Sequence, residues 1–167
     1  METGTALFSR RVRQNHALEH ATVTILARDI PRLNVSARSN ARGFTIYAPL
    51  DPEQVRAAAM EALARLQAGE AHLAIHPNCG TNLAVGTSVA MIGSLFALNA
   101  VRPRTRVASA VASSLAGFAA ARPLGRLVQR HVTTLPDLRG VRIVGVTRRI
   151  FLRGRVVEVL TAVDGMR

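Results

Sequence analysis

Two histidines one helical turn apart are the residues of this chain that point most directly to chemistry. His16 and His20 stand four residues apart, and Glu19 directly precedes the second of them. If this segment is helical, both imidazoles lie on one face and can reach a single metal ion. The order H-x-x-E-H is the inverted form of the zinc-protease motif, in which the glutamate acts as general base on a metal-bound water.

A second group of candidate ligands follows further along the chain. Glu70, His72, His76 and the only cysteine, Cys79, all fall within eleven consecutive positions, residues 70–80. His76 and Cys79 are separated by a proline-bearing turn that can bring both side chains to one point. Most of the five histidines and the sole cysteine therefore occupy two short segments. This clustering predicts a zinc site, because zinc prefers nitrogen and sulfur donors.

The two segments allow two kinds of zinc site. The two helix histidines, His16 and His20, together with His76 and Cys79 would form a closed site of the structural type. The same two histidines with only one of Glu70, His76 or Cys79 would leave a fourth coordination position for water. In that open site Glu19 would be the catalytic base of a zinc-dependent hydrolase such as a peptidase. The opposing hypothesis is a non-enzymatic membrane protein in which the same side chains form a buried hydrogen-bond network, and the sequence leaves this choice open.

The positive charge of the chain comes from arginine alone. The formal net charge is +12, and the sequence contains no lysine. So basic a chain favours anionic partners such as phospholipid headgroups or nucleic acid. Nucleic acid is the less favoured of the two, because aromatic residues make up only 4% of the chain and do not interleave with the arginines. A single cysteine excludes an internal disulfide, which fits a reducing compartment or a thiolate ligand.

Two uncharged stretches in the middle of the chain predict a transmembrane helical hairpin. Residues 83–101 are rich in alanine, valine, leucine, glycine and serine, and a membrane helix needs about 20 such residues. Residues 107–121 form a stretch shorter than a membrane helix needs, but the side chains of Arg106 and Arg122 at its ends can extend to the headgroups. Two buried helices of a soluble bundle are the alternative, which we disfavour because neither stretch has a charged face. The arginines that follow the second stretch favour cytoplasmic termini under the positive-inside rule.

Helix and strand patterns flank this hairpin. Apolar residues recur at helical spacing over 15–27, and an Asp-Pro-Glu start predicts a second helix over 51–67. Apolar and polar residues alternate like strands at 34–38 and 43–48. After the hairpin, residues 141–144 and 156–160 alternate in the same way and predict a strand pair.

These elements predict an α+β membrane protein in three parts. Residues 1–80 would form a small helix–β-hairpin–helix domain with the metal motifs. Residues 81–124 would form the two-helix transmembrane hairpin, and residues 125–167 a basic segment with a short helix and a strand pair. The lipid bilayer is the expected partner, with anionic headgroups as possible ligands of the arginines, and the sequence leaves a homo-oligomer open.

Longer motifs in this chain resemble an uncharacterised protein family. The motifs are NHALEHATV at 15–23, RGF at 42–44, GEAHLAIHPNCGTN at 69–82, RPLG at 122–125 and QRHVTT at 129–134. Together they resemble domain of unknown function 6391, a family of small bacterial membrane proteins that includes cyanobacterial members. The resemblance spans about residues 15–134 and implies a membrane protein in which the two histidine motifs belong together. It carries over no activity, cofactor or catalytic residue, and the similarity to inverted zinc proteases is confined to the five residues from His16 to His20.

Overall fold

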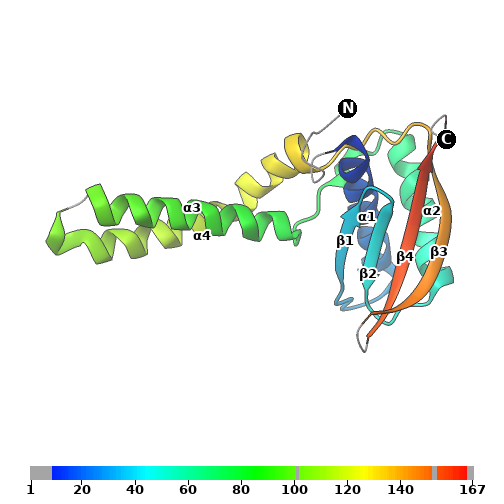
Figure 1. The fold of residues 1–167 in the computed structure, drawn as a ribbon, viewed down its shortest axis with the longest axis horizontal. Helices are drawn as coiled ribbons and strands as arrows, with labels where there is room; N and C mark the ends of the chain where they lie inside the picture. Colours follow the sequence, from blue (N-terminus) through cyan, green and yellow to red (C-terminus); the bar gives the residue numbers. More distant parts are fainter. Residues whose placement is uncertain (1–8, 101, 152–153, 165–167) are drawn as a thin grey trace. The chain divides into compact units, whose positions relative to one another are not determined.

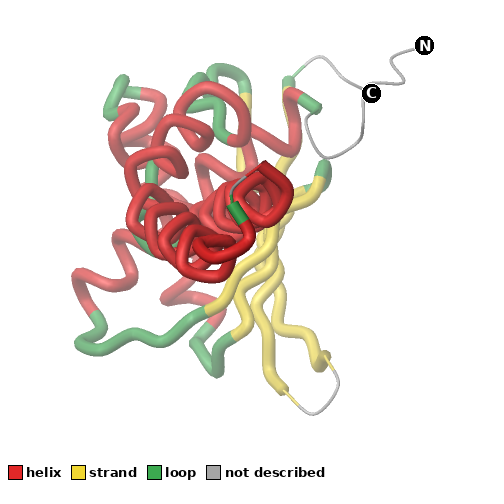
Figure 2. Tube along the Cα trace, turned by 90° about the vertical axis from the view of Figure 1, so that its left-hand side faces the viewer, coloured by secondary structure: helices red, strands yellow, loops and turns green. Residues whose placement is uncertain are grey.

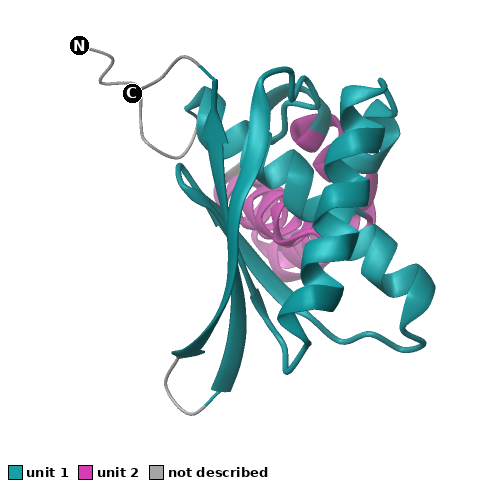
Figure 3. Ribbon diagram, turned by 90° about the vertical axis from the view of Figure 1, so that its right-hand side faces the viewer, with its two compact units in different colours: residues 1–76, 130–167 teal, residues 77–129 magenta. Residues whose placement is uncertain are grey.

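The computed structural model describes residues 9–100, 102–151 and 154–164 of the chain (Figure 1). Contacts divide the chain into two compact units. The first unit consists of residues 1–76 and 130–167, and the second of residues 77–129 (Figure 3). The first unit is therefore assembled from both ends of the chain, and the second is inserted between them.

The first unit is built on one antiparallel sheet with the strand order β1-β2-β4-β3. The strands are β1 (Ser36–Asn40), β2 (Gly43–Tyr47), β3 (Val141–Phe151) and β4 (Gly154–Val163). They form one twisted sheet (Figure 2). Helices α1 (Arg10–Asp29) and α2 (Pro52–Gln67) lie on the same side of it (Figure 3). Mixed helix and antiparallel strand confirm the α+β prediction.

Local capping explains where both helices begin. The Ser9 hydroxyl accepts a hydrogen bond from the Val12 amide at the start of α1. The Asp51 carboxylate accepts one from the Glu53 amide at 2.9 Å, and Pro52 occupies the first turn of α2. Such side-chain acceptors satisfy amide groups that have no partner within the helix. The Asp-Pro-Glu pattern that predicted α2 therefore corresponds to the capping arrangement at the start of this helix.

The core of the first unit lies between the two helices and the sheet. Leu18 and Leu26 of α1 and Val55 of α2 are buried against Phe44 and Ile46 of β2. Alternate residues of a strand face opposite sides, so these two β2 side chains point toward the helices together. Apolar burial of this kind is the main stabilising contribution to the unit.

The two C-terminal strands complete the N-terminal sheet. β2 pairs with β4 from Gly43 opposite Leu160 to Ile46 opposite Val157. Gly43 has a φ of 155°. A Cβ at this position would collide with the Val159 carbonyl oxygen, so this start of β2 requires glycine. Sequence patterning placed the strand pair in a separate segment, residues 125–167. In the structure, this strand pair belongs to the sheet of the first unit. A two-stranded hairpin alone is only marginally stable, and pairing with β4 satisfies the hydrogen-bonding edge of β2.

The second unit is a helical hairpin. Helix α3 (Gly80–Ala100) and helix α4 (Arg106–Val128) are joined through the short turn η3 (Pro103–Thr105). Both helices are long and apolar enough to cross a membrane, and their most apolar 18-residue windows have mean hydropathies of 1.5 within Gly80–Asn99 and 1.2 within Pro103–Thr133. The apolar stretches therefore form helices as predicted, and α4 continues past the expected end at residue 121 into the π-helical turn η4 (Gln129–Thr133).

Small residues bring the two helices of this hairpin together. A Cβ on Gly117 would lie 2.5 Å from the backbone nitrogen of Ala90, so only glycine fits there. The hydroxyls of Ser94 and Ser114 lie 2.8 Å apart, which adds a hydrogen bond between the helices. Close approach over small residues with an interhelical hydrogen bond is typical of helix pairs in lipid.

Candidate metal centre

Helix α1 carries the paired histidines on one face. The ring centroids of His16 and His20 are 4.3 Å apart, in an edge-to-face arrangement. The helix begins well before them at Arg10 and continues beyond them to Asp29, so neither histidine lies in a fraying end. The helical spacing predicted from the sequence is therefore present, and it brings both rings to one place.

Each histidine is held by a backbone carbonyl. His16 Nδ1 is 3.0 Å from the Thr133 carbonyl oxygen, and His20 Nδ1 is 2.8 Å from the Ala74 carbonyl oxygen. A carbonyl oxygen only accepts, so in each ring Nδ1 carries the proton and donates it. In the neutral form of each ring, the lone pair is then on Nε2. This is the arrangement in which metal-binding histidines are usually held.

The Nε2 atom of His20 has an unsatisfied lone pair. His20 is only 3% exposed, and its Nε2 atom is buried without a hydrogen-bond partner among the described residues. A buried polar group left in this state costs about 1–3 kcal/mol. A metal ion at this atom would remove that penalty.

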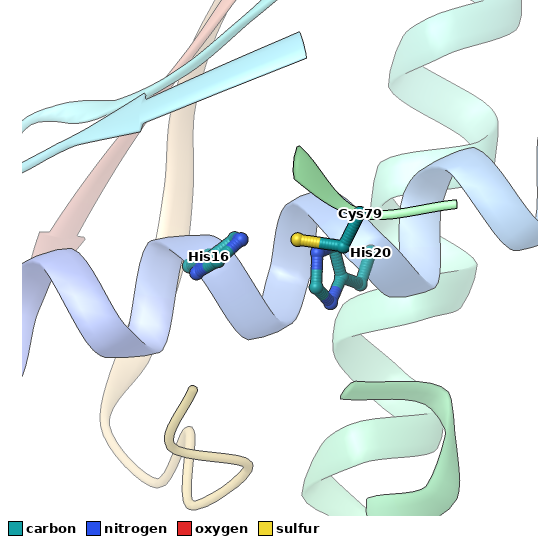
Figure 4. A group of neighbouring side chains, drawn as sticks. All are labelled: His16, His20 and Cys79. Atoms are coloured by element: carbon teal, nitrogen blue, oxygen red, sulfur yellow. The ribbon is translucent and has the colours of Figure 1, made fainter. Parts of the chain in front are cut away.

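Cys79 offers a third candidate ligand atom (Figure 4). One ligand atom from each of His16, His20 and Cys79 lies within 4.8 Å of the others. Cys79 belongs to the first residues of the second unit, but it follows His76 by three positions, which span at most about 11 Å of extended chain. The His76 ring centroid is itself 5.8 Å from that of His20.

The surroundings of the cysteine sulfur suit a ligand. Cys79 is half-buried and, as the single cysteine of the sequence, forms no internal disulfide. The backbone amide of Thr81 donates to Sγ at 3.4 Å, and the Cys79 thiol donates to the Thr81 hydroxyl oxygen at 3.3 Å. A metal ion would displace the thiol proton, because the thiolate is the form of cysteine that binds metal.

Glu19 is anchored to the sheet. Its carboxylate accepts a hydrogen bond from the Ser39 hydroxyl of β1. Glu19 is only 7% exposed. Burial raises the pKa of Glu19, whereas the Ser39 hydrogen bond and the charge of His16 act in the opposite direction. The carboxylate is therefore close enough to His16 to interact with it, but its hydrogen bond is directed to β1.

The remaining predicted ligands lie in different surroundings. His76 is next to His20, and burial, with a smaller effect of the His20 charge, lowers the pKa of His76. It is outside the group of three ligand atoms within 4.8 Å. Both oxygens of Glu70 accept hydrogen bonds from Arg65, at 2.9 and 2.7 Å, and the pKa of Glu70 is lowered by them. The structure thus brings together His16, His20 and Cys79 of the predicted set, with His76 beside them and Glu70 in an ion pair.

Several groups that organise the site carry no sequence signal. The carbonyls of Ala74 and Thr133 orient the two histidines, and any residue type could supply them. Arg13 lies one turn before His16 and donates to the carbonyls of His131 and Thr134, at 3.2 and 3.3 Å. Through these hydrogen bonds α1 holds both the segment that leads into α3 and the segment that follows α4.

Comparisons with known proteins place the chain among relatives without an assigned activity. A family model described as a domain of unknown function matches residues 11–146. An uncharacterized protein of Picosynechococcus sp. is 33% identical over 134 residues, which cover 74% of this chain and 65% of that relative. The match thus spans less than two thirds of the relative's length. No solved structure matches the chain.

Proposed function

The chain belongs to the family described as domain of unknown function 6391, and we propose that it is a membrane protein that binds zinc through His16, His20 and Cys79. One observation carries this proposal. Both histidines donate Nδ1–H to backbone carbonyls, and the buried Nε2 of His20 has no partner in the described part of the chain. A buried imidazole preset in this tautomer needs only a metal ion to complete its bonding.

The apolar surface of the second unit supports the membrane part of the proposal. Only 22% and 6% of the most apolar windows of α3 and α4 are buried within the structure. Large side chains such as Ile92, Phe96 and Leu115 are exposed on them. A core helix of a soluble protein would bury such residues, whereas lipid solvates them. The arginines after α4 favour an orientation with cytoplasmic termini.

The donor set favours zinc over harder metals. Two imidazole nitrogens and one thiolate are borderline to soft ligands, which suit zinc and exclude calcium or magnesium as good occupants. Three protein ligands leave a fourth position for water, as in catalytic zinc sites. His76, beside His20, would close the site if its ring moved into that position.

The open site leads to a zinc-dependent hydrolase, with a peptidase as the first activity to assay. Bound zinc would lower the pKa of its water ligand. Glu19 would accept the water proton, and a buried carboxylate with a raised pKa suits that task. The hydrogen bond from Ser39 to Glu19 favours the alternative, a non-enzymatic metal protein in which Glu19 only fixes α1 against the sheet.

Metal analysis of the full chain in detergent tests the site. We expect near-stoichiometric zinc in the wild type, loss of zinc in a His16→Ala/His20→Ala double variant and weakened binding in Cys79→Ser. His72→Ala is the matched control, because His72 belongs to the same segment but is exposed and outside the group of ligands. Folded wild-type protein that takes up no zinc, even when zinc is supplied, would overturn the proposal.

A Glu19→Gln variant separates the enzyme from the structural alternative. If Glu19 is the catalytic base, the zinc-loaded Glu19→Gln variant should lack the hydrolytic activity of the wild type. If zinc-loaded wild-type protein cleaves no member of a peptide library, the hydrolase is excluded and the metal-binding proposal stands.

A further inference from the structure

The hairpin of β3 and β4 extends beyond the rest of the sheet. Its ladder runs from Val141 opposite Val163 to Phe151 opposite Gly154. The partner strand β2 ends its described pairing with β4 at Val157. The last pairs of the β3–β4 hairpin therefore have no β2 neighbour, and this end lies apart from the other strands (Figure 3). We call residues 148–151 and 154–155 the hairpin end.

The hairpin end combines an exposed apolar side chain with arginines. Ile150 is 83% exposed, the highest value among the large hydrophobic residues that the structure describes. Arg148, Arg149 and Arg155 around it are also exposed. The unit buries almost none of the Ile150 side chain. Any apolar contact that stabilises this side chain therefore has to come from a partner outside the unit.

The charge of this region is strongly unbalanced. Glu158 is the only acidic residue between Val141 and Val159. It already pairs with Arg149 at 2.6 Å, and its side chain is only 12% exposed. Of the arginines that the structure describes at this end, Arg148 and Arg155 are left to attract an anionic partner.

We propose that the hairpin end docks on an anionic lipid bilayer, with Ile150 entering the headgroup boundary and Arg148 and Arg155 contacting lipid phosphates. An exposed apolar side chain beside arginines is the pattern that binds anionic membrane surfaces, where burial and charge attraction act together. The proposal rests on the membrane anchoring proposed above, since an anchored chain stays at a lipid surface. The family match ends at residue 146, so the docking site would be a feature of this chain beyond the matched segment.

A single tryptophan can report this contact, because the chain contains none. The full-length Ile150→Trp variant is placed in nanodiscs of phosphatidylcholine alone or mixed with phosphatidylglycerol, with brominated acyl chains as quenchers. We expect a blue shift and quenching in the anionic discs, reversed by about 0.5 M salt, which screens exposed charges to about 4 Å. Val144→Trp is the matched control, because Val144 is exposed on the same strand away from the end. Its emission should stay that of a water-exposed indole.

Charge variants test the arginines. Adding Arg148→Gln and Arg155→Gln to Ile150→Trp should weaken docking roughly fivefold per arginine. Adding Arg142→Gln should leave docking unchanged, because Arg142 lies at the other end of β3 and pairs with Asp164 at 3.0 Å.

The outcomes separate this inference from the membrane proposal. A protein that does not enter nanodiscs refutes the anchoring. An Ile150→Trp protein that enters them but shows no quenching of its indole refutes the docking alone. Equal quenching in neutral discs, or a blue shift caused by added RNA instead of lipid, would also overturn it, because either result replaces the anionic bilayer as the partner.

Discussion

At the scale of single residues, α1 directs its polar side chains to two different structures. His16 and His20 donate to carbonyls of the segments that flank the helical hairpin. Glu19, between them in sequence, accepts from Ser39 of the sheet. Neighbouring positions on a helix point in different directions, so one motif can bind a metal on one side and fasten the helix on the other.

Removal of the Ser39 hydroxyl tests the role of Glu19 as an anchor. We expect Ser39→Ala to lower the free energy of unfolding by about 1–3 kcal/mol, because a buried carboxylate loses its hydrogen-bond donor. Zinc stoichiometry should be unchanged. Chemical denaturation measures the effect, and Ser36→Ala at an exposed position of the same strand is the control. Equal stability of the two variants would show that the hydrogen bond contributes nothing.

At the scale of elements, the site is linked to both segments that join the two units. His20 binds the last residue of η2 (Ala71–Ala74), which precedes α3, and His16 binds the last residue of η4, which follows α4. Metal bound at Nε2 would fix both rings and, through Nδ1, both segments. The metal site and the connections of the helical hairpin are therefore expected to be ordered together.

Hydrogen–deuterium exchange can follow this coupling. Zinc should slow amide exchange in residues 71–75 and 130–135, and His20→Ala should speed exchange in the first of these segments. Strands β1 and β2 serve as the internal control and should not respond. Zinc binding without any change in either segment would contradict the expected coupling.

The packing of α3 against α4 gives a second prediction at this scale. Gly117→Ala should destabilise the hairpin by about 1–3 kcal/mol, because the new methyl group would overlap the Ala90 backbone. Gly80→Ala is the control, since a Cβ there meets nothing within 4 Å. Thermal unfolding in detergent should separate the two variants. A Gly117→Ala protein as stable as wild type would mean that the helices do not approach this closely.

At the scale of the whole molecule, the first unit depends on its C-terminal strands. Thr161 of β4 donates to the Asn15 side chain of α1 at 2.7 Å, and Arg11 donates to the Thr161 carbonyl at 3.0 Å. Asn15 in turn donates to the Asn40 carbonyl of β1 at 2.7 Å. This buried network joins the first helix, the first strand and the last strand.

A chain truncated after Arg139 should therefore fail to fold its first unit. It would lose β3 and β4, expose Phe44 and Ile46, and lose zinc binding with the positioning of α1. The control replaces residues 150–155 with a two-residue Asn-Gly turn, which leaves Arg149 opposite Val156 and keeps all β2–β4 pairs. Cooperative unfolding measured by circular dichroism should persist in the control alone. Cooperative unfolding of the truncated chain would favour an independent domain over residues 1–80.

Local patterns in the sequence were sufficient to predict the helices and to place two candidate ligands, His16 and His20, on one of them. The periodicity around Leu18 and Leu26 predicts α1, and the spacing of His16 and His20 requires only a helix to bring the rings together. The apolar stretches predict α3 and α4 because hydropathy depends on composition alone. Each of these features is decided within about 20 residues of chain.

Tertiary structure decided the features that join distant residues. The pairing of β2 with β4 connects positions more than 100 residues apart, and no periodicity encodes which strand fills an edge. The carbonyls of Ala74 and Thr133 fix the tautomers of the histidines, although backbone groups have no sequence signature. Glu70 lies in an ion pair with Arg65, which only the folded chain forms, whereas Cys79 belongs to the group that could hold a metal. The sequence by itself therefore determined the candidate ligands and their helix, and the fold decided which hydrogen-bond partners and neighbours each candidate has.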